Sequence, residues 1–227
     1  MTPFLQQAES EGFSIYFIRH GRTVCEPCVY GRTDVDICEP EEGDFPVFVK
    51  KHGLEDFRLC SSPLLRCRKT ASYFQKALNG APEPEIIEDL QEISLGELDG
   101  LPFSKYNDRQ QKLLRTALTR PAYVKIPGAE NVSMLRRRAM KVTESLISRK
   151  ENIIAVTHCG IIKAIYAHLM GISVRNNQLW LNWDLDFLAG LKLTCAVDRT
   201  TGGMKRSFAI LEPAARSVRA EQKTEQK

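Results

Sequence analysis

The sequence of 227 residues contains no apolar run long enough to cross a lipid bilayer. Its most apolar late segment, residues 185–197, is too short for a membrane span and contains Asp186 and Lys192. The first twelve residues hold two acidic residues and no basic residue, whereas an export signal begins with a positively charged stretch. We therefore expect no membrane partner and no secretion.

The sequence also has little net charge. It contains 32 lysine and arginine residues against 28 aspartate and glutamate residues, an excess of four. Residues 213–227 contribute two of those four, so residues 1–212 are close to neutral. This balance gives no indication of a nucleic-acid partner. The polar composition of residues 213–227 predicts a disordered tail behind one folded domain, residues 1–212.

The cysteines do not form a recognisable framework. There are seven, an odd number, and a chain with 43% hydrophobic residues does not need disulfides to build a core. The simplest interpretation is a reducing, cytoplasmic environment. Cys25 and Cys28 form one Cys-x-x-Cys pair, followed by Cys38 and His52, but the sequence has no second pair. That spacing is incomplete for a zinc site, so we expect no metal and no other cofactor.

Segments with the pattern of strands alternate with segments with the pattern of helices. Strands are predicted over residues 14–18, 57–60 and 152–157, and helices over 63–78, 104–118, 130–149 and 160–170. Ser62 is interpreted as the N-cap of the first helix. Residues 25–48 are predicted to form a loop, and three later runs, 179–184, 188–197 and 207–211, to complete or flank the sheet. The alternation predicts an α/β fold of three layers, α/β/α, with helices on both faces of a largely parallel central sheet.

Two histidines directly follow strand-like segments. His20 lies in Arg19-His20-Gly21-Arg22-Thr23, and His158 follows the strand that ends at Thr157. Because parallel strands end at the same edge of a sheet, both histidines are expected at that edge, where ligands bind in open α/β sheets. Arg66 lies in the first turn of a helix that follows another strand. Two imidazoles and two guanidinium groups, those of Arg19 and Arg66, can therefore converge on one small volume.

Phosphoryl transfer is the chemistry that suits this set of side chains. Guanidinium groups donate paired hydrogen bonds to phosphate oxygens and stay charged at any working pH. A neutral imidazole can attack phosphorus near neutral pH, and a second, protonated imidazole can donate to an equatorial oxygen. Arginine and imidazolium would then supply the positive charge without a metal. Taken singly, each residue is more often structural, and only the joint arrangement favours a catalytic site.

Six motifs in order along the chain carry a family resemblance. They are Arg19-His20-Gly21-Arg22-Thr23, Gly31-Arg32-Thr33-Asp34, Ser61-Ser62-Pro63-Leu64-Leu65-Arg66, Leu90-Gln91-Glu92 with its continuation to Gly100, Pro127-Gly128-Ala129-Glu130-Asn131, and Val156-Thr157-His158-Cys159-Gly160. Together they resemble the histidine phosphatase superfamily, in its phosphoglycerate mutase-like branch. The resemblance covers about residues 14–170.

The resemblance implies a role for each site residue. His20 would become the phosphohistidine, and Glu92 would protonate the leaving alkoxide and then take a proton from the attacking water. Three residues would bind the transferred phosphoryl group: Arg19, Arg66 and His158. The turn after the signature would bring Arg32 and Thr33 to the substrate. No metal is implied.

Three positions depart from the family pattern. Glu26 stands where asparagine is usual, Leu98 where tryptophan is usual, and Cys159 where glycine or alanine is common. A carboxylate at position 26 would repel a phosphate unless it points away. The other two change the shape of the pocket, so they leave the substrate open more than the chemistry.

The resemblance favours a phosphomonoester hydrolase that acts on a small phosphorylated metabolite. A cofactor-dependent phosphoglycerate mutase is the second hypothesis, but only 26 residues separate Gly100 from Pro127, which is short for the mutase's extra segment. An α-ribazole phosphatase is a further alternative in the same branch. A non-catalytic binding module is disfavoured because every implied site residue is present. A homodimer is left open.

Other residues are given plainer interpretations. Arg136, Arg137 and Arg138 are predicted to form mostly a solvated helix face. Trp180 and Trp183 are expected in the core or in a pocket wall. Three basic residues after the Glu92 motif are weak candidates for substrate contacts: Lys105, Arg109 and Lys112.

Overall fold

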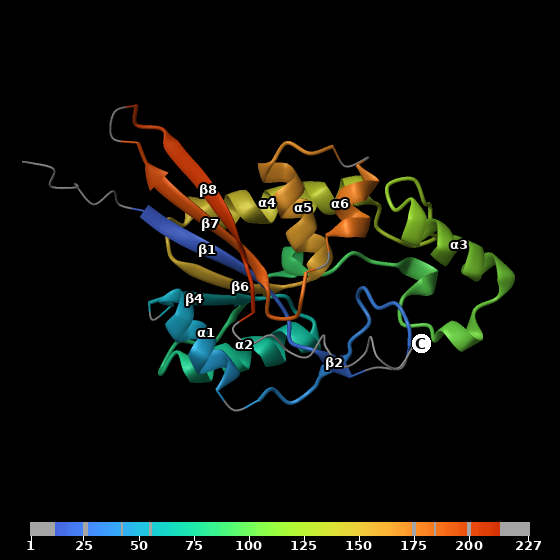
Figure 1. Ribbon diagram of the computed structural model, residues 1–227, viewed down its shortest axis with the longest axis horizontal. Coiled ribbons are helices and arrows are strands. Elements are labelled where there is room, and N and C mark those ends of the chain that lie inside the picture. Colours follow the sequence, from blue (N-terminus) through green and yellow to red (C-terminus); the bar gives the residue numbers. More distant parts are fainter. Residues whose placement is uncertain are drawn as a thin grey trace, which may run out of the picture.

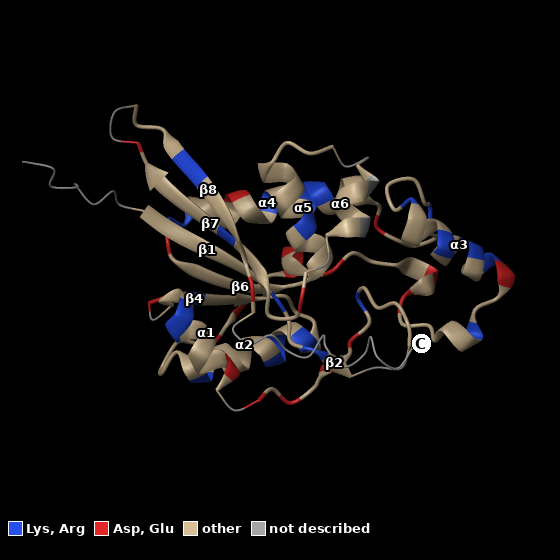
Figure 2. Ribbon diagram, in the orientation of Figure 1, with Lys and Arg blue, Asp and Glu red and all other residues tan. Residues whose placement is uncertain are grey.

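Figure 1 shows a computed structural model of the chain, which describes residues 12–24, 27–41, 43–54, 56–173, 176–183, 185–198 and 201–213. Nearly all of the predicted tail, together with Cys25 and Glu26, lies outside these ranges. Within them, no helix is both long and apolar enough to span a bilayer. Basic and acidic residues are interspersed over both helix layers (Figure 2), in keeping with the small net charge.

A six-stranded sheet forms the centre of the fold. Its strands stand in the order β5–β4–β6–β1–β7–β8 (Figure 1). Their bounds are β1 Gly12–Arg19, β4 Arg58–Ser61, β5 Glu85–Ile86, β6 Ile153–Thr157, β7 Gly190–Val197 and β8 Met204–Leu211. The first four strands in that order are parallel, β7 pairs antiparallel with β1, and β8 pairs antiparallel with β7. The predicted α/β fold with a largely parallel sheet is confirmed.

Helices cover both faces of this sheet. Helices α1 (Asp44–His52) and α2 (Leu65–Ala77) pack on one face over a core that includes Phe48 and Ile18. Helices α4 (Val132–Ser148) and α5 (Cys159–Leu169) pack on the other face over Leu135 and Phe17. Neighbouring residues of β1, Phe17 and Ile18, belong to different cores because successive side chains of a strand point to opposite faces.

The remaining elements lie around one end of the sheet. They are the antiparallel pair β2 (Thr23–Val24) and β3 (Asp36–Ile37), three short 3-10 helices, η1 (Glu88–Leu90), η2 (Gly96–Leu98) and η3 (Phe103–Lys105), and helices α3 (Asp108–Thr119) and α6 (Asn177–Asn182). Figure 1 shows α3 as the outermost helix, beyond α6. Helix α3 begins with a capping box between Asn107 and Gln110.

One prediction about elements is wrong. The expected loop over 25–48 contains β3 and the start of α1, which forms because it buries Phe45, Phe48 and Val49 against the sheet and α2. In the run 179–184, which was expected to complete or flank the sheet, residues 179–182 belong to helix α6 rather than to a strand, and residue 184 lies outside the described residues. The N-cap residue of α6, Asn176, accepts from the backbone N–H of Gln178. An apolar run this short fits either structure, so its pattern could not decide between them.

Strand register brings the predicted site residues to one edge. The register between β1 and β6 aligns Arg19 with Thr157, so the next residue of each strand is a histidine. The backbone N–H of His20 continues the pairing by donating to the carbonyl of Thr157 at 3.0 Å. Strand β4 ends at the same level, which brings Ser62 beside His158.

Candidate active site

His20 is buried directly after β1, and one of its two ring nitrogens forms a hydrogen bond within the protein. Its Nδ1 lies 2.8 Å from the carbonyl oxygen of Gly21. A carbonyl only accepts hydrogen bonds, so Nδ1 carries the proton in the neutral ring, and Nε2 keeps its lone pair. Burial lowers the pKa of His20 well below its usual value, and the charges of Arg19 and Arg66 lower it further, against a small opposing effect of the Gly21 bond. His20 therefore presents an unprotonated nitrogen at neutral pH.

His158 lies beside His20 and is held by fixed partners. The centroids of the two rings are 5.2 Å apart. The Nε–H of Arg66 donates to Nδ1 of His158 at 3.2 Å, and Nε2 lies 2.8 Å from the hydroxyl of Ser62 and 3.3 Å from Sγ of Cys67. Because the arginine can only donate, the proton of the neutral ring is on Nε2.

This environment differs from the expected protonated second imidazole. Burial lowers the pKa of His158 well below its usual value, and four positively charged or ionisable neighbours, His20, Arg66, Arg138 and Arg19, lower it further. The ring is neutral and donates through Nε2. The interpretation of Ser62 as the N-cap of α2 is also wrong, because the N-cap residue is Leu64. The hydroxyl of Ser62 instead accepts a hydrogen bond from Nε2–H of His158.

Arg66 is completely buried in the first turn of α2. Besides its bond to His158, Nη1 donates to the carbonyl of Thr33 at 2.9 Å, and Nη2 to that of Gly31 at 2.5 Å. A guanidinium has five N–H groups, so these three bonds leave two N–H groups for a ligand. The guanidinium carbon also lies 5.2 Å from the ring centroid of Tyr30.

The turn over residues 31–33 supports Arg66 with its backbone. The Thr33 hydroxyl donates to Asp99 at 2.7 Å, and the Arg32 guanidinium, whose side chain is 45% exposed, lies 3.8 Å from Glu130. Both side chains thus contact carboxylates of this chain, and neither of them hydrogen-bonds to His20 among the described residues. Their predicted role at the substrate stays a prediction.

Asp99 organises this turn and was missed by the sequence analysis. Its carboxylate accepts the backbone N–H groups of three consecutive residues, Gly31, Arg32 and Thr33, at 2.8–3.0 Å, and that of Leu95 at 3.2 Å. Burial raises the pKa of Asp99, but these hydrogen bonds outweigh burial and lower it overall. The signal in the sequence that could have indicated this role is the position of Asp99, directly before Gly100 in the motif that begins at Leu90.

Arg19 is fixed at the last position of β1 by the segment that precedes β7. One Nη group donates to the carbonyl of Leu185, and the guanidinium carbon stacks 4.1 Å from the ring centroid of Phe187. The Nε of Arg19 is buried and has no hydrogen-bond partner among the described residues. This buried donor is suited to an anion.

Phe187 is a second site residue that the sequence analysis missed. Its ring centroid lies 5.8 Å from that of His20, and it also faces Arg22 at 5.8 Å. The next residue, Leu188, has a left-handed backbone with φ of 59°, which is strained for a leucine. The strained turn holds the ring of Phe187 beside His20, Arg19 and Arg22.

Glu92 lies where the end of its loop meets the start of α5. Its Oε1 accepts from the backbone N–H of Ile93 at 2.8 Å, and its Oε2 from that of Gly160 at 3.0 Å. A Cβ atom at position 160 would overlap Oε1 and lie 3.1 Å from Cδ of Glu92. Gly160 therefore provides the space that the carboxylate occupies.

Arg138 donates hydrogen bonds to the backbone of the loop that carries Glu92. The prediction that Arg138 belongs to a solvated helix face is therefore wrong. Its side chain is 12% exposed, and Nη1 donates to the carbonyls of Asp89 and Gln91 at 2.8 and 2.6 Å. Nη2 contacts the carbonyl of Glu92 at 3.3 Å and the buried carboxylate of Glu130 at 2.6 Å. Arg138 thus links α4 to the backbone that carries Glu92.

Only part of the cysteine motif, Cys28, Cys38 and His52, lies among the described residues. No group of three or more histidine, cysteine, aspartate or glutamate residues there is arranged to hold a metal ion. The described cysteines form no disulfide with one another. Cys25 lies outside the described residues, so the Cys25–Cys28 pair itself is not tested.

The fold and the site define an α/β phosphate-handling enzyme built around two histidines. The chain belongs to the histidine phosphatase superfamily (branch 1), which it matches over residues 15–186. It is 28% identical over 172 residues to the metal-independent phosphoserine phosphatase of Arabidopsis thaliana, an alignment that covers 72% of this chain and 71% of the relative. The predicted family is confirmed, and with it the enzyme class, a phosphomonoesterase.

Solved structures share the fold at low sequence identity. Mycobacterial hydrolase 2 superposes with a TM-score of 0.72 at 18% identity, covering 94% of this chain and 96% of that one. A putative alpha-ribazole-5'-P phosphatase from Escherichia coli superposes with a TM-score of 0.70 at 16% identity, covering 91% and 98%. These likenesses concern the fold.

Proposed function

We propose that the protein hydrolyses a small phosphorylated metabolite through a phosphohistidine on His20. Nε2 of His20 attacks phosphorus, and the bond from phosphorus to the leaving oxygen breaks. Glu92 gives its proton to the leaving oxygen, which departs as an alcohol. Water then attacks phosphorus while its proton passes to Glu92, and the N–P bond breaks to release phosphate.

The transferred group would be held by donors from three strand ends. The unpaired Nε–H of Arg19 and the two remaining N–H groups of Arg66 would bind its oxygens, and Nε2–H of His158 would turn from Ser62 to a third. These preorganised donors stabilise the charge that spreads over the equatorial oxygens in the transition state. Arginines supply the positive charge, so the proposed reaction uses no metal.

The state of His20 is the observation that carries this proposal. The bond from Nδ1 to the Gly21 carbonyl leaves Nε2 as the unprotonated nitrogen, and a depressed pKa keeps it so at neutral pH. The odd number of cysteines in a chain that needs no disulfide to build its core is the reason for proposing a reducing, cytoplasmic setting. A homodimer stays an open prediction.

Trapping the phosphoenzyme tests the proposal. Rapid acid-free quenching during turnover of p-nitrophenyl phosphate should give an acid-labile, base-stable phosphoenzyme and a burst of nitrophenol. His20→Asn should remove both. His168→Asn is the matched control, because His168 lies on α5 with a distant carboxylate partner at 3.9 Å. Equal phosphoenzyme yields from His20→Asn and the control would overturn the nucleophile assignment.

A further inference from the structure

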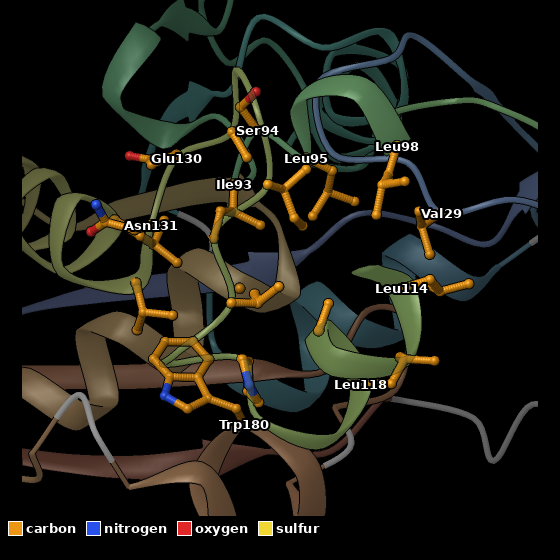
Figure 3. Close-up of a pocket in the computed structure, with 18 of the residues that line it drawn as sticks. Val29, Ile93, Ser94, Leu95, Leu98, Leu114, Leu118, Glu130, Asn131 and Trp180 are labelled. Carbon is orange, nitrogen blue, oxygen red and sulfur yellow. The ribbon is translucent and has the colours of Figure 1, made fainter. Parts of the chain in front are cut away.

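Exposed apolar side chains gather on the hairpin formed by β7 and β8. Strand β8 is the outer edge of the sheet (Figure 1), and seven of its eight residues are exposed, Leu211 being the buried one. Leu118 on α3 is also exposed, but it borders a cavity that this chain itself forms (Figure 3). Four large apolar side chains on one face of the hairpin are at least 37% exposed: Val197, Met204, Phe208 and Ile210. An exposed apolar patch of this kind is typical of an interaction surface.

The outer edge of β8 presents backbone groups that no described residue pairs with. The backbone N–H of Asp198 donates to the carbonyl of Gly203 at 2.7 Å, in the same register that pairs β7 with β8. Hydrogen-bonded and non-hydrogen-bonded pairs alternate along an antiparallel ladder, so the odd-numbered residues of β8 bond to β7. The even-numbered residues of β8 therefore turn their N–H and C=O groups outward: Met204, Arg206, Phe208 and Ile210.

The hairpin is held in one position by the two helices beside it. The guanidinium of Arg206 donates to both carboxylate oxygens of Glu144 on α4, at 2.7 and 2.9 Å. The ring of Phe208 packs edge-on against Tyr166 of α5, with 5.6 Å between the ring centroids. A strand that is already ordered loses little conformational freedom when it binds, so β8 is a preorganised template for another strand.

We propose that β8 pairs with β8 of a second copy of this chain, antiparallel about a twofold axis at Ser207, so that the two sheets join into one. In this register Met204 lies opposite Ile210 of the second copy, and Arg206 lies opposite Phe208 of the second copy. All four outward-facing residues then belong to hydrogen-bonded pairs, each of which exchanges two backbone bonds. An apolar pair and an arginine–aromatic pair stabilise the same face. The dimer does not depend on the proposed hydrolysis.

The sequence of β8 favours a second copy over an unrelated strand because it is complementary to itself about this axis. Lys205, whose charge is paired with Asp198 of its own chain at 2.9 Å, lies opposite Ala209 of the second copy. No two like charges are then directly opposite each other. An axis at Lys205 or at Arg206 would set that residue opposite itself, and the like charges would repel. An axis at Phe208 would shorten the paired segment.

Engineered disulfides test the register. Ser207 would lie opposite Ser207 of the second copy in a non-hydrogen-bonded pair, whose Cα atoms are about 4.5 Å apart, within the range that a disulfide spans. Ser207→Cys should therefore give a disulfide-linked dimer under oxidised glutathione, seen on a non-reducing gel. Ala209→Cys, exposed on the same face of β8, is the matched control, because its two copies would be about 14 Å apart. Wild-type protein treated in parallel measures the background from the seven native cysteines.

Charge substitutions test the opposed pair of Met204 and Ile210. In sedimentation equilibrium from about 1 μM to about 100 μM, wild-type protein should pass from monomer to dimer. Met204→Lys combined with Ile210→Lys sets lysine opposite lysine in both copies of the pair, so the dissociation constant should rise at least about tenfold. Met204→Lys combined with Ile210→Glu sets lysine opposite glutamate and should keep the dissociation constant within about threefold of wild type. Both side chains are exposed, and far-UV circular dichroism checks that each variant is folded.

Four results would overturn the paired strands. Wild-type protein that stays monomeric over the whole concentration range has no such interface. A dimer in which Ser207→Cys crosslinks no faster than wild type associates through another surface. Equal crosslinking of Ser207→Cys and Ala209→Cys would contradict the twofold axis at Ser207. Equal loss of the dimer in the two double variants would show that residues 204 and 210 do not face each other.

Discussion

Arg66 donates its Nε–H to Nδ1 of His158 across 3.2 Å, and both side chains are completely buried. This bond fixes the tautomer of His158, so that its Nε2–H donates to the hydroxyl of Ser62. The same guanidinium is anchored to the backbone of the 31–33 turn, which Asp99 holds in place. Arg66 therefore orients the second imidazole, and in the proposed reaction it would also bind the phosphoryl oxygens.

The substitution Arg66→Lys should distinguish the contribution of the positive charge at position 66 from that of the guanidinium geometry. Lysine keeps the positive charge but lacks the planar fork that reaches His158 and the turn together. We expect kcat/KM for p-nitrophenyl phosphate to fall about 10²–10³-fold, the usual effect of losing a transition-state donor. Arg68→Lys, an exposed position on the same helix, is the control. A folded Arg66→Lys protein within threefold of wild type would contradict the assigned role.

Gly160→Ala should disturb Glu92 without removing it. The added methyl group would overlap Oε1 of Glu92, so the carboxylate must move away from the leaving oxygen. Turnover of alkyl phosphates should fall about 10²–10⁴-fold, as expected for loss of general acid catalysis. The loss on p-nitrophenyl phosphate should be far smaller, because nitrophenolate leaves without a proton.

Two comparisons make the Gly160 result specific. Glu92→Gln should give the same unequal losses on the two esters. Gly203→Ala changes an exposed glycine without a left-handed backbone and should leave both rates unchanged. Equal losses on both esters in Gly160→Ala would argue that the substitution damages the fold or the phosphate site rather than the acid.

The sequence predicts the parts of the site that depend on strand ends. His20 and His158 follow strands, so a parallel sheet brings them together by topology alone. Asp99 and Arg138 could not be assigned in this way, because their partners are backbone groups about 47 to 68 residues away along the chain. Phe187 has no polar group, and only the fold shows that a strained turn places its ring beside His20.

Helix α1 shows a similar limit of local patterns. Its sequence contains Pro46 and follows a run of acidic residues, which favours a loop. The helix forms because Phe45, Phe48 and Val49 fill the space beside α2, a tertiary contact that no local pattern contains. Fold class and phosphate chemistry were therefore predictable, whereas the residues that position the site were not.

Arg138→Met should destabilise the protein and Arg137→Met should not. Arg138 forms a buried pair with Glu130 and holds three backbone carbonyls near Glu92, whereas Arg137 is exposed. Removing one partner of a buried pair leaves the other charge uncompensated and costs about 3–5 kcal/mol. Urea unfolding of both variants measures this free energy, and equal values would show that Arg138 is a surface residue after all.

The two site histidines should make the protein lose stability as the pH falls below 6.5. Burial and the neighbouring arginines lower the pKa of His20 and of His158 in the folded state, whereas the unfolded chain titrates near 6.5. Below 6.5 the unfolded state therefore binds more protons than the folded state, and the free energy of unfolding decreases with decreasing pH. The slope is at most about 1.4 kcal/mol per pH unit for each histidine.

Urea unfolding between pH 7.5 and pH 5 measures this slope before most carboxylates titrate. His20→Gln should reduce the slope, since it removes one of the two groups that resist protonation. His52 also contributes to the slope of unfolding free energy against pH, because burial and the charges of Lys51 and Lys192 lower its pKa in the folded state. A free energy of unfolding that stays constant from pH 7.5 to pH 5 would mean that the site histidines are hydrated and protonate freely in the folded protein.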